Sequence, residues 1–247
     1  MRGHISLNMK IRIDGRPHDK IRPINVTYNI FEYAAGSVLF ELGKTKVLCS
    51  VMFEQGVPKF LKGSGQGWLT AEYSLLPAAT KQRMQRDSTN MKANGRSLEI
   101  SRLIGRSIRS VVDVSHIGEN TIWIDCDVVQ ADGGTRTASI NAAYLALKKA
   151  EERLLEEKRI KGPLLKDQIA SISAGIFKGD VLLDLNCEED NLAEADLNFV
   201  LTKSGKVVEI QGTAEGEPIP WADFEKIKDV VQKGIKQIFA AYSTLKI

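Results

Sequence analysis

One stretch of this sequence restricts the possible folds more than any other, because a strand pattern in it passes through a glycine pair into a helix pattern. Over residues 121–129 apolar and polar side chains alternate, which is typical of a strand with one buried face. Gly133 and Gly134 interrupt the pattern, and residues 135–157 are rich in alanine and leucine. The stretch predicts a strand, a tight turn and a long helix.

Further strand and helix patterns lie on both sides of this unit. Two alternating runs, 38–42 and 46–51, are separated by Gly43-Lys44-Thr45 at the spacing of a hairpin. A strand over 68–75, a polar basic loop over 77–96 and an amphipathic basic helix over 97–112 follow. Beyond the unit come strand patterns over 170–177, 181–185, 196–202 and 206–211, and a helix from residue 222 onward. This order predicts an α+β domain with two related halves.

Composition limits the class of protein. The chain has 247 residues, 43% of them hydrophobic, which is enough for a substantial core. Its formal net charge of +3 is too small to indicate a nucleic-acid-binding protein by itself. Cys49, Cys126 and Cys187 are far apart, each in a strand-like run, which favours buried reduced thiols and a cytoplasmic protein. No apolar run has the roughly 18 residues of a membrane span, so we expect no membrane association.

The glycine turn contains the strongest chemical signal, in Gln130-Ala131-Asp132-Gly133-Gly134-Thr135-Arg136-Thr137-Ala138-Ser139. The N–H groups and positive dipole end at the start of a helix attract anions, and Gly134 permits close approach. Thr135, Thr137 and Ser139 add hydroxyl donors, and the planar guanidinium of Arg136 matches phosphate oxygens. Together they could hold orthophosphate. A plain turn, with Thr135 capping the helix and Arg136 exposed, explains the same residues equally well.

An acidic cluster beside a predicted strand is the second candidate site. Five carboxylates stand close together in the sequence, at Glu188, Glu189, Asp190, Glu194 and Asp196. Like charges this close repel each other unless solvent or a cation such as Mg²⁺ compensates them. From these residues alone, a solvated surface loop is favoured over a metal site.

The stretch 130–139 resembles the phosphate-binding segment of the ribonuclease PH family in its bacterial form. The similarity extends from Ile13 to the last predicted helix, in blocks that keep the family's order. These blocks are Asp14-Gly15-Arg16, Gly65-Gln66-Gly67-Trp68-Leu69-Thr70-Ala71-Glu72-Tyr73, Arg102-Leu103-Ile104-Gly105-Arg106, Asp125-Cys126-Asp127, Leu183-Asp184-Leu185-Asn186 and Gln211-Gly212-Thr213-Ala214-Glu215-Gly216. Agreement of several ungapped blocks identifies the chain as a member of this family.

The resemblance implies the ribonuclease PH fold, an α+β fold of two stacked β-rich halves whose βα architecture is like that of ribosomal protein S5 domain 2. It implies a single domain over 13–247, with halves at 13–160 and 161–247, after an N-terminal extension over 1–12. Family members usually assemble as homohexameric rings, built as trimers of dimers, and the same assembly is expected here.

The resemblance also implies an activity, the phosphorolytic 3′-to-5′ trimming of RNA, with tRNA precursors as substrates. Orthophosphate is the co-substrate, nucleoside 5′-diphosphates are released, and the reaction is reversible. Asp190 and Asp196 match the family's catalytic pair, which binds Mg²⁺ or Mn²⁺, and Asp184 is expected to have a structural role. Arg83 and Arg86 match arginines that position the tRNA 3′ end.

Arg96 and Arg136 match the family's two phosphate-gripping arginines, which also take part in catalysis. The implied phosphate-binding set is Arg96, Gly134, Thr135, Arg136, Thr137 and Ser139. This assignment requires the turn at Thr135 and Arg136 to lie close enough to the Asp190 and Asp196 pair for both to contact one small ligand.

The chain departs from the family pattern in its basic loop. Ala78 stands where members commonly have arginine, so one cationic RNA contact is lost, and Lys81 is near enough to replace it. Two other readings stay open. One is an exosome-core-like subunit or a fragment resembling half of polynucleotide phosphorylase, both of which share this domain, and the other is a noncatalytic ring subunit that only binds RNA. Retention of both phosphate arginines and both aspartates disfavours the noncatalytic reading. A nucleoside-triphosphate hydrolase is disfavoured because the sequence lacks a Gly-Lys-Ser/Thr phosphate loop.

Overall fold

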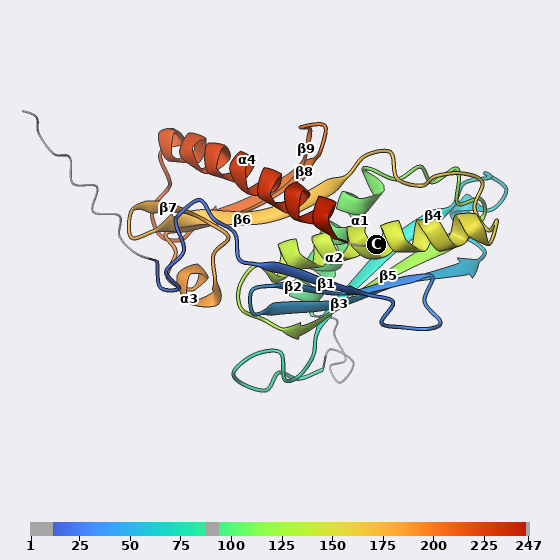
Figure 1. The fold of residues 1–247 in the computed structure, drawn as a ribbon, viewed down its shortest axis with the longest axis horizontal. Coiled ribbons are helices and arrows are strands. Elements are labelled where there is room, and N and C mark those ends of the chain that lie inside the picture. Colours follow the sequence, from blue (N-terminus) through green and yellow to red (C-terminus); the bar gives the residue numbers. More distant parts are fainter. Residues whose placement is uncertain (1–11, 87–93, 246–247) are drawn as a thin grey trace, which may run out of the picture.

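Two β-sheets with helices packed on them form the described part of the chain (Figure 1). The structure is a computed structural model, and it describes residues 12–86 and 94–245. The first half contains β1 (Ile24–Tyr28), β2 (Gly36–Leu42), β3 (Thr45–Gln55), the short 3-10 helix η1 (Lys59–Leu61), β4 (Trp68–Leu75), α1 (Gly95–Arg109), β5 (Asn120–Gln130) and α2 (Thr135–Glu156). The second half contains β6 (Ile169–Phe177), β7 (Asp180–Leu183), α3 (Cys187–Asp190), β8 (Ala195–Thr202), β9 (Val207–Ala214) and α4 (Trp221–Thr244).

The first sheet has the strand order β1-β2-β3-β5-β4, and β4 and β5 are its parallel pair. A parallel neighbour requires a crossover connection, and α1 lies in that connection and packs against β4. Both strands end at one edge of the sheet, where Leu75 is opposite Val128. The loop after β4 and the glycine turn after β5 therefore start side by side. The N–H of Ala131 donates to the carbonyl of Ala79 at 2.8 Å and joins the two segments.

The second sheet is antiparallel, in the order β7-β6-β8-β9. Its strand β6 is buried along its whole length, because α2 packs against strands of both sheets and α4 covers β6 and β7. Asn141 of α2 completes the pairing of β6, since its amide donates to the Ser171 carbonyl at 2.9 Å and accepts from the Ser171 N–H at 2.8 Å. Tyr242 of α4 donates to the same amide at 2.9 Å. The helix α2 thus joins the two halves.

The sequence patterns predict most of these elements correctly. The alternating runs at 38–42 and 46–51 correspond to β2 and β3, and the long helix predicted at 135–157 is α2. The predicted α+β class with two β-rich halves is confirmed. The strand β1 and the one-turn helix α3 are present in the structure but are not predicted by the sequence patterns. Within the described residues, no helix combines the length and apolar character that crossing a membrane requires.

The three cysteines are free, as expected, but they do not share one environment. Cys49 and Cys126 are buried partners on the neighbouring antiparallel strands β3 and β5, with their Sγ atoms 3.6 Å apart. The expectation that Cys187 lies in a strand is wrong. Its neighbour Asn186 caps a helix there, and Cys187 is a half-buried residue of α3.

The glycine turn of the first half packs directly against the second half. Gly133 has φ 78°, and a Cβ atom at this position would lie 2.6 Å from the carbonyl oxygen of Leu185. Both the left-handed backbone and this close approach require glycine. The chain enters α3 just after Leu185. The contact therefore places α3 beside the start of α2.

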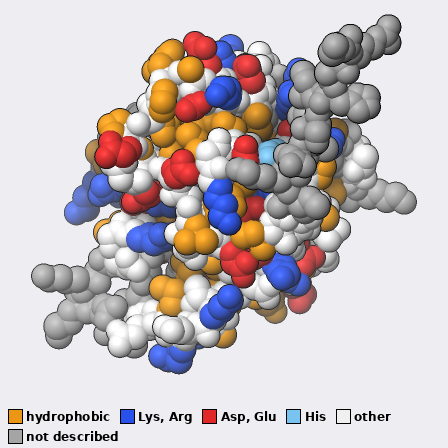
Figure 2. Space-filling view, turned by 90° about the vertical axis from the view of Figure 1, so that its left-hand side faces the viewer, with side chains coloured by type: hydrophobic (Ala, Val, Ile, Leu, Met, Phe, Trp, Pro, Cys, Tyr) orange, Lys and Arg blue, Asp and Glu red, His pale blue; other side chains and the backbone are white. Residues whose placement is uncertain are grey.

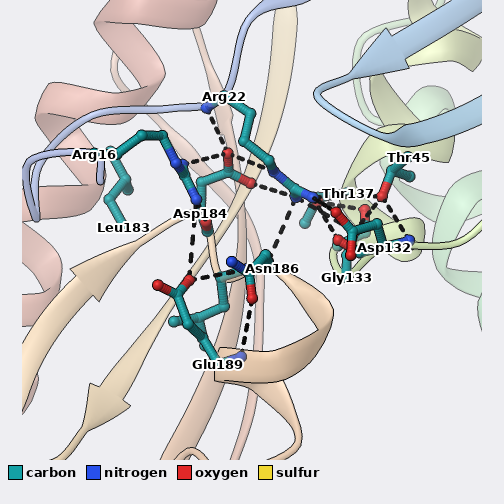
Figure 3. Close-up of polar contacts among 12 residues, drawn as sticks. Arg16, Arg22, Thr45, Asp132, Gly133, Thr137, Leu183, Asp184, Asn186 and Glu189 are labelled. Carbon is teal, nitrogen blue, oxygen red and sulfur yellow. Dashed lines mark hydrogen bonds and ion pairs between the residues drawn. The ribbon is translucent and has the colours of Figure 1, made fainter. Parts of the chain in front are cut away.

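A buried arginine next to this turn connects the two halves (Figure 3). Arg22 is 4% exposed, and it donates to the carboxylate of Asp184 from Nε at 3.0 Å, from Nη2 at 2.7 Å and from its backbone N–H at 2.7 Å. Its guanidinium also donates to the carbonyls of Asp132 at 2.5 Å and Gly133 at 3.3 Å. Thr45 donates to the same Gly133 carbonyl at 2.7 Å. Arg22 and Thr45 thus fix the shape of the turn, and Arg22 connects it to Asp184 of the second half.

Asp184 is the charged partner of Arg22 in the second half. It is fully buried, and its φ of 53° is uncommon for a residue other than glycine. Burial alone would raise the pKa of Asp184, but the charge and hydrogen bonds of Arg22 and the charge of Arg16 outweigh it and hold that pKa below its usual value. The ionised carboxylate therefore stabilises the fold as long as its arginines are present.

We expect Arg22→Met to lower the free energy of unfolding by about 3 kcal/mol at neutral pH, because it leaves the buried Asp184 carboxylate with less compensation. This loss should shrink on acidification. In the wild type, the lowered pKa of Asp184 gives stability that is present above the unfolded-state value of about 3.9 and lost as the pH falls below it. A protonated Asp184 needs no cation, so the variant loses less at acidic pH.

Urea unfolding at neutral pH and at about pH 4 measures this difference. Arg106→Met is the matched control, because Arg106 pairs with Glu209 at the surface, at 2.7 Å. The control should cost less than about 1 kcal/mol. An equal loss from Arg22→Met at both pH values would contradict the assigned role of the Asp184 charge.

Candidate active site

Residues from three elements meet at the sheet edge where β4 and β5 end. Arg136 is the second residue of α2, and its Nη2 donates to Glu99 of α1 at 3.0 Å. Arg96 lies three residues before Glu99, on the same side of α1. Tyr73, near the end of β4, donates its hydroxyl to Oγ1 of Thr135 at 3.0 Å. The first turns of α1 and α2 therefore lie close together beside the end of β4.

Arg136 has hydrogen-bonding capacity that the protein does not use. Its side chain is 27% exposed, and Glu99 occupies only its Nη2. Its Nε is buried and has no hydrogen-bond partner among the described residues. Buried N–H groups are nearly always paired, and a guanidinium binds phosphate oxygens with two parallel donors. The unpaired Nε is therefore a donor that an anionic ligand could use.

The start of α2 supplies further donors at the same place. Gly134 is the N-cap, with φ 65°, and no side chain accepts a capping hydrogen bond there. Uncapped N–H groups in a first helical turn, with the positive end of the helix dipole, bind anions. Thr135 accepts from Tyr73 and can still donate its own hydroxyl proton.

Two predicted phosphate contacts, Thr137 and Ser139, do not reach the surface beside Arg136. Thr137 is fully buried, and its hydroxyl donates to the carbonyl of Gly134 at 2.9 Å. Ser139 is also fully buried, beside Cys126 of β5. Thr137 is two positions from Thr135 and therefore faces another side of the helix, whereas Ser139, four positions on, faces the same side as Thr135 but lies one turn further along α2. Burial therefore separates both side chains from the exposed surface beside Arg136, although the Ser139 hydroxyl has no hydrogen-bond partner among the described residues. The phosphate-binding set that the geometry supports is Arg96, Gly134, Thr135 and Arg136.

The second half contributes Asp190 and Asp196 to the same region. Asp190 is the last residue of α3, and Asp196 is the second residue of β8, where it accepts from Thr213 at 3.3 Å. Desolvation and the charge of Asp196 raise the pKa of Asp190, while the charges of Arg136 and Arg96 act in the opposite direction. Asp190 is exposed as a residue, so the like charge of Asp196 is the more important cause. The two arginines and two carboxylates are thus near enough to interact.

This carboxylate pair is suited to a divalent cation. No cluster of three or more His, Cys, Asp or Glu side chains that could hold a metal ion occurs within 12–86 and 94–245. Mg²⁺, however, is usually bound by one or two carboxylates and takes its other ligands from water and substrate phosphates. A bound cation would also relieve the repulsion that raises the pKa of Asp190. Asp190 and Asp196 therefore fit Mg²⁺ or Mn²⁺ next to a phosphate ligand.

The basic loop after β4 leaves the same edge of the sheet. Arg83 and Arg86 are exposed on it, and the remainder of the loop, 87–93, lies outside the described residues. Ala78 is also exposed and directly precedes the buried Ala79, which contacts the glycine turn through Ala131. At the end of the molecule that contains β7 and α3, acidic, basic and hydrophobic side chains are intermixed (Figure 2). This mixture agrees with the small net charge of +3, so any RNA-binding surface must be local.

Tyr73 and Glu99 contact the proposed phosphate residues, but the sequence patterns do not single them out. The only available signal for Glu99 is its i,i+3 spacing from Arg96 on a predicted helix. Burial raises the pKa of Tyr73, and the hydrogen bond to Thr135 and the two arginine charges offset part of that increase. Tyr73 therefore stays a neutral phenol that holds Thr135 in place.

Solved structures share this fold. The chain resembles rice (Oryza sativa) Rrp46 with a TM-score of 0.76 and 20% sequence identity, over 94% of this chain and 99% of that chain. It is similar to a chain of the Archaeoglobus fulgidus exosome with RNA bound to the active site, with a TM-score of 0.78 and 25% identity, over 96% of this chain and 93% of that chain. A chain of an archaeal exosome core has a TM-score of 0.72 and 26% identity, over 92% and 89%.

The family descriptions agree with the two halves of the structure. Domain 1 of the 3′ exoribonuclease family, RNase PH, matches residues 20–151, and domain 2 matches residues 167–235. The first match includes Arg96 and Arg136, and the second includes Asp190 and Asp196. The predicted boundary at residue 160 falls between the matches and stays a prediction. Because the matches cover most of the chain and its ribonuclease PH fold is confirmed, the protein belongs to the 3′ exoribonuclease (RNase PH) family.

Proposed function

We propose that this chain is a phosphorolytic 3′-to-5′ exoribonuclease that uses orthophosphate to shorten RNA, with tRNA precursors as natural substrates. The main support is Arg136. Its unpaired Nε lies at the uncapped start of α2, and its charge acts on Asp190 of the opposite half. Transfer of a nucleotide from RNA to orthophosphate requires an anion-binding group next to a carboxylate pair. The arginines bind the orthophosphate, and the carboxylates bind a cation that serves the terminal phosphate of the RNA.

In this proposal orthophosphate is the nucleophile, so no serine or cysteine of the protein attacks. The N–H groups that follow Gly134, the Thr135 hydroxyl, Arg136 and Arg96 hold the phosphate and reduce its repulsion by the RNA backbone. An orthophosphate oxygen forms a bond to the terminal phosphorus, and the bond from that phosphorus to the preceding 3′ oxygen breaks. The shortened RNA takes up a proton as its new 3′ hydroxyl, and a nucleoside 5′-diphosphate leaves.

Asp190 and Asp196 would hold Mg²⁺ or Mn²⁺, which supplies electrostatic stabilisation of the charge that develops on the leaving oxygen. The cleaved phosphodiester is replaced by a phosphoanhydride, so the reaction is reversible. Excess nucleoside diphosphate therefore extends RNA 3′ ends in the same site.

Arg83 and Arg86 are proposed to bind RNA. Both are exposed on the loop that starts beside the glycine turn, where contacts to RNA phosphates do not depend on sequence. The similar chain from Archaeoglobus fulgidus belongs to an exosome with RNA bound to the active site, which supports an RNA substrate here. Ala78 is exposed on the same loop, so the missing arginine at this position weakens contacts to RNA and leaves the phosphate chemistry unchanged.

A noncatalytic or exosome-core-like ring subunit is the second candidate, and the similarity to Rrp46 and to archaeal exosome chains favours it. The presence of both arginines and both aspartates in one place favours the enzyme. Native mass spectrometry distinguishes the assemblies, since the enzyme is proposed to form a homohexamer built as a trimer of dimers. An exosome-like subunit would need a second kind of chain to complete a ring.

The direct test is phosphorolysis of oligoadenylate by the purified protein with Mg²⁺. We expect ADP release only when orthophosphate is present, and extension of the oligonucleotide when ADP is in excess. Chromatography of the nucleotide products measures both. Release of AMP without phosphate would show hydrolysis instead, and binding of the oligonucleotide with no release would support the noncatalytic subunit.

Arg136→Ala should raise the KM for orthophosphate by about tenfold or more, because it removes charge-assisted hydrogen bonds to the nucleophile. Affinity for the oligonucleotide should change much less. Arg106→Ala is the control, since Arg106 forms its ion pair on the surface with Glu209 instead. Initial rates over a phosphate series at saturating RNA give the phosphate KM, and a binding titration with the oligonucleotide in the absence of phosphate gives its affinity. An unchanged phosphate KM in Arg136→Ala would remove this residue from the site.

Asp190→Asn should reduce turnover by at least about tenfold without lowering stability. Its raised pKa means that the ionised Asp190 carboxylate costs folding free energy above the unfolded-state value, and a neutral amide removes that cost. Glu188→Gln removes the same charge from an exposed position of α3 and serves as the control. Turnover and thermal unfolding are measured on all three proteins. Wild-type turnover in Asp190→Asn at limiting Mg²⁺ would contradict the assignment.

A further inference from the structure

The N-terminal arm, residues 12–22, contacts the segment that carries Asp190, although most of it precedes the matched family domain. Arg12 is 4% exposed, and Glu189 of α3 is fully buried. Arg12 donates to the Glu189 carboxylate from Nε at 2.8 Å and from Nη2 at 2.5 Å. This is a bidentate pair, the geometry in which arginine fixes a carboxylate most firmly.

Arg12 also binds the backbone that leads into α3. Its Nη1 donates to the carbonyl of Leu183 at 2.7 Å, and its Nη2 donates to the carbonyl of Asp184 at 3.0 Å. Arg16 donates to the same Asp184 carbonyl at 3.0 Å. One guanidinium therefore connects the end of β7 to the acidic helix, at the point where Asp184 takes its left-handed backbone conformation.

The helix α3 depends on Glu189 for its shape. It has only four residues, and so short a helix is not stable by itself. Its capping box has two hydrogen bonds, because the N–H of Glu189 donates to the Asn186 side chain at 3.0 Å and the N–H of Asn186 donates to the Glu189 carboxylate at 3.1 Å. The carboxylate that closes the helix is thus the one that Arg12 holds.

Asp190 directly follows Glu189, and its backbone N–H donates to the carbonyl of Asn186 at 2.8 Å. Its carboxylate has no hydrogen-bond partner among the residues that the structure describes. The direction of the Asp190 side chain is therefore set by the backbone of α3. Its carboxylate is repelled by Asp196 and attracted by Arg136 and Arg96, so its position relative to these charges depends on how α3 is held.

We infer that Arg12 is a positioning residue for the metal site, which holds Glu189 and through the single turn of α3 orients Asp190 toward Asp196. This inference rests on the proposed function, in which Asp190 and Asp196 bind the divalent cation. Arg12 itself touches neither the cation nor the RNA. Its contribution lies in the geometry of a ligand, and residues that orient ligands have effects comparable to the ligands themselves.

Arg12→Lys keeps the charge but loses the fork that binds both carboxylate oxygens. We expect about tenfold weaker Mn²⁺ binding in this variant, measured by electron paramagnetic resonance of free Mn²⁺ in the absence of RNA. In phosphorolysis, the Mg²⁺ concentration for half-maximal rate should rise by a similar factor, with the KM for orthophosphate within about twofold of the wild type, because the phosphate ligands lie on α1 and α2. Excess Mg²⁺ should restore turnover, since both carboxylates remain.

Two further variants separate positioning from stability. Arg106→Lys changes the surface pair with Glu209 in the same way and should leave Mn²⁺ binding unchanged. The double variant Arg12→Leu with Glu189→Leu removes the buried pair and keeps its volume filled, a replacement that folded proteins often tolerate. Near-ultraviolet circular dichroism checks the fold, and we expect this double variant to be folded and to bind Mn²⁺ as weakly as Arg12→Lys.

Wild-type Mn²⁺ affinity in a folded Arg12→Lys or double variant overturns the inference, and so does unfolding of both, since the pair is then needed for the fold as a whole. If the wild-type protein binds no Mn²⁺, both the positioning role of Arg12 and the assignment of Asp190 and Asp196 as a metal site are overturned. A wild type that binds Mn²⁺ but releases no nucleoside diphosphate contradicts the proposed function alone. The loss in the variants then still shows that Arg12 positions the ligands.

Discussion

The ion pair between Arg22 and Asp184 is the interaction on which the rest of this structure depends. A carboxylate in the interior is costly unless cations and hydrogen-bond donors surround it, and here the N-terminal arm provides them. The same guanidinium binds the carbonyls of the glycine turn, so the compensation of one buried charge also fixes that turn. Without it, the start of α2 and the segment before α3 would be joined by the close backbone contact of Gly133 with Leu185 but would lose their charged connection.

The site is therefore assembled from short segments that have little stability of their own. The phosphate-binding groups come from the first turns of α1 and α2, and the carboxylates come from a one-turn helix and the start of a strand. A ligand shared by them needs the groups to be held in place before it arrives, because ordering them at binding would cost affinity. Buried arginine contacts from the N-terminal arm provide that order at some distance from the reacting atoms.

Sequence reasoning finds what is local and misses what is distant. Alternation and glycine placement predict β5, the turn and α2, and the family-like blocks place Arg136 and Asp190 in one site. Arg22 and Asp184 are separated by 162 positions in the sequence, and Arg12 and Glu189 by 177 positions. No periodic pattern indicates contacts over such separations. The burial of Thr137 and Ser139 could not be foreseen either. The helix α2 is buried around most of its circumference, so its sequence does not show which side is open.

In the proposed function, a phosphate held by Arg136 next to a cation held by Asp190 and Asp196 would join the two family domains. Its binding free energy therefore adds to the cohesion of the whole chain, in proportion to the logarithm of its concentration above the dissociation constant. Under the proposed function, orthophosphate would thus stabilise the folded protein as well as act as its reactant.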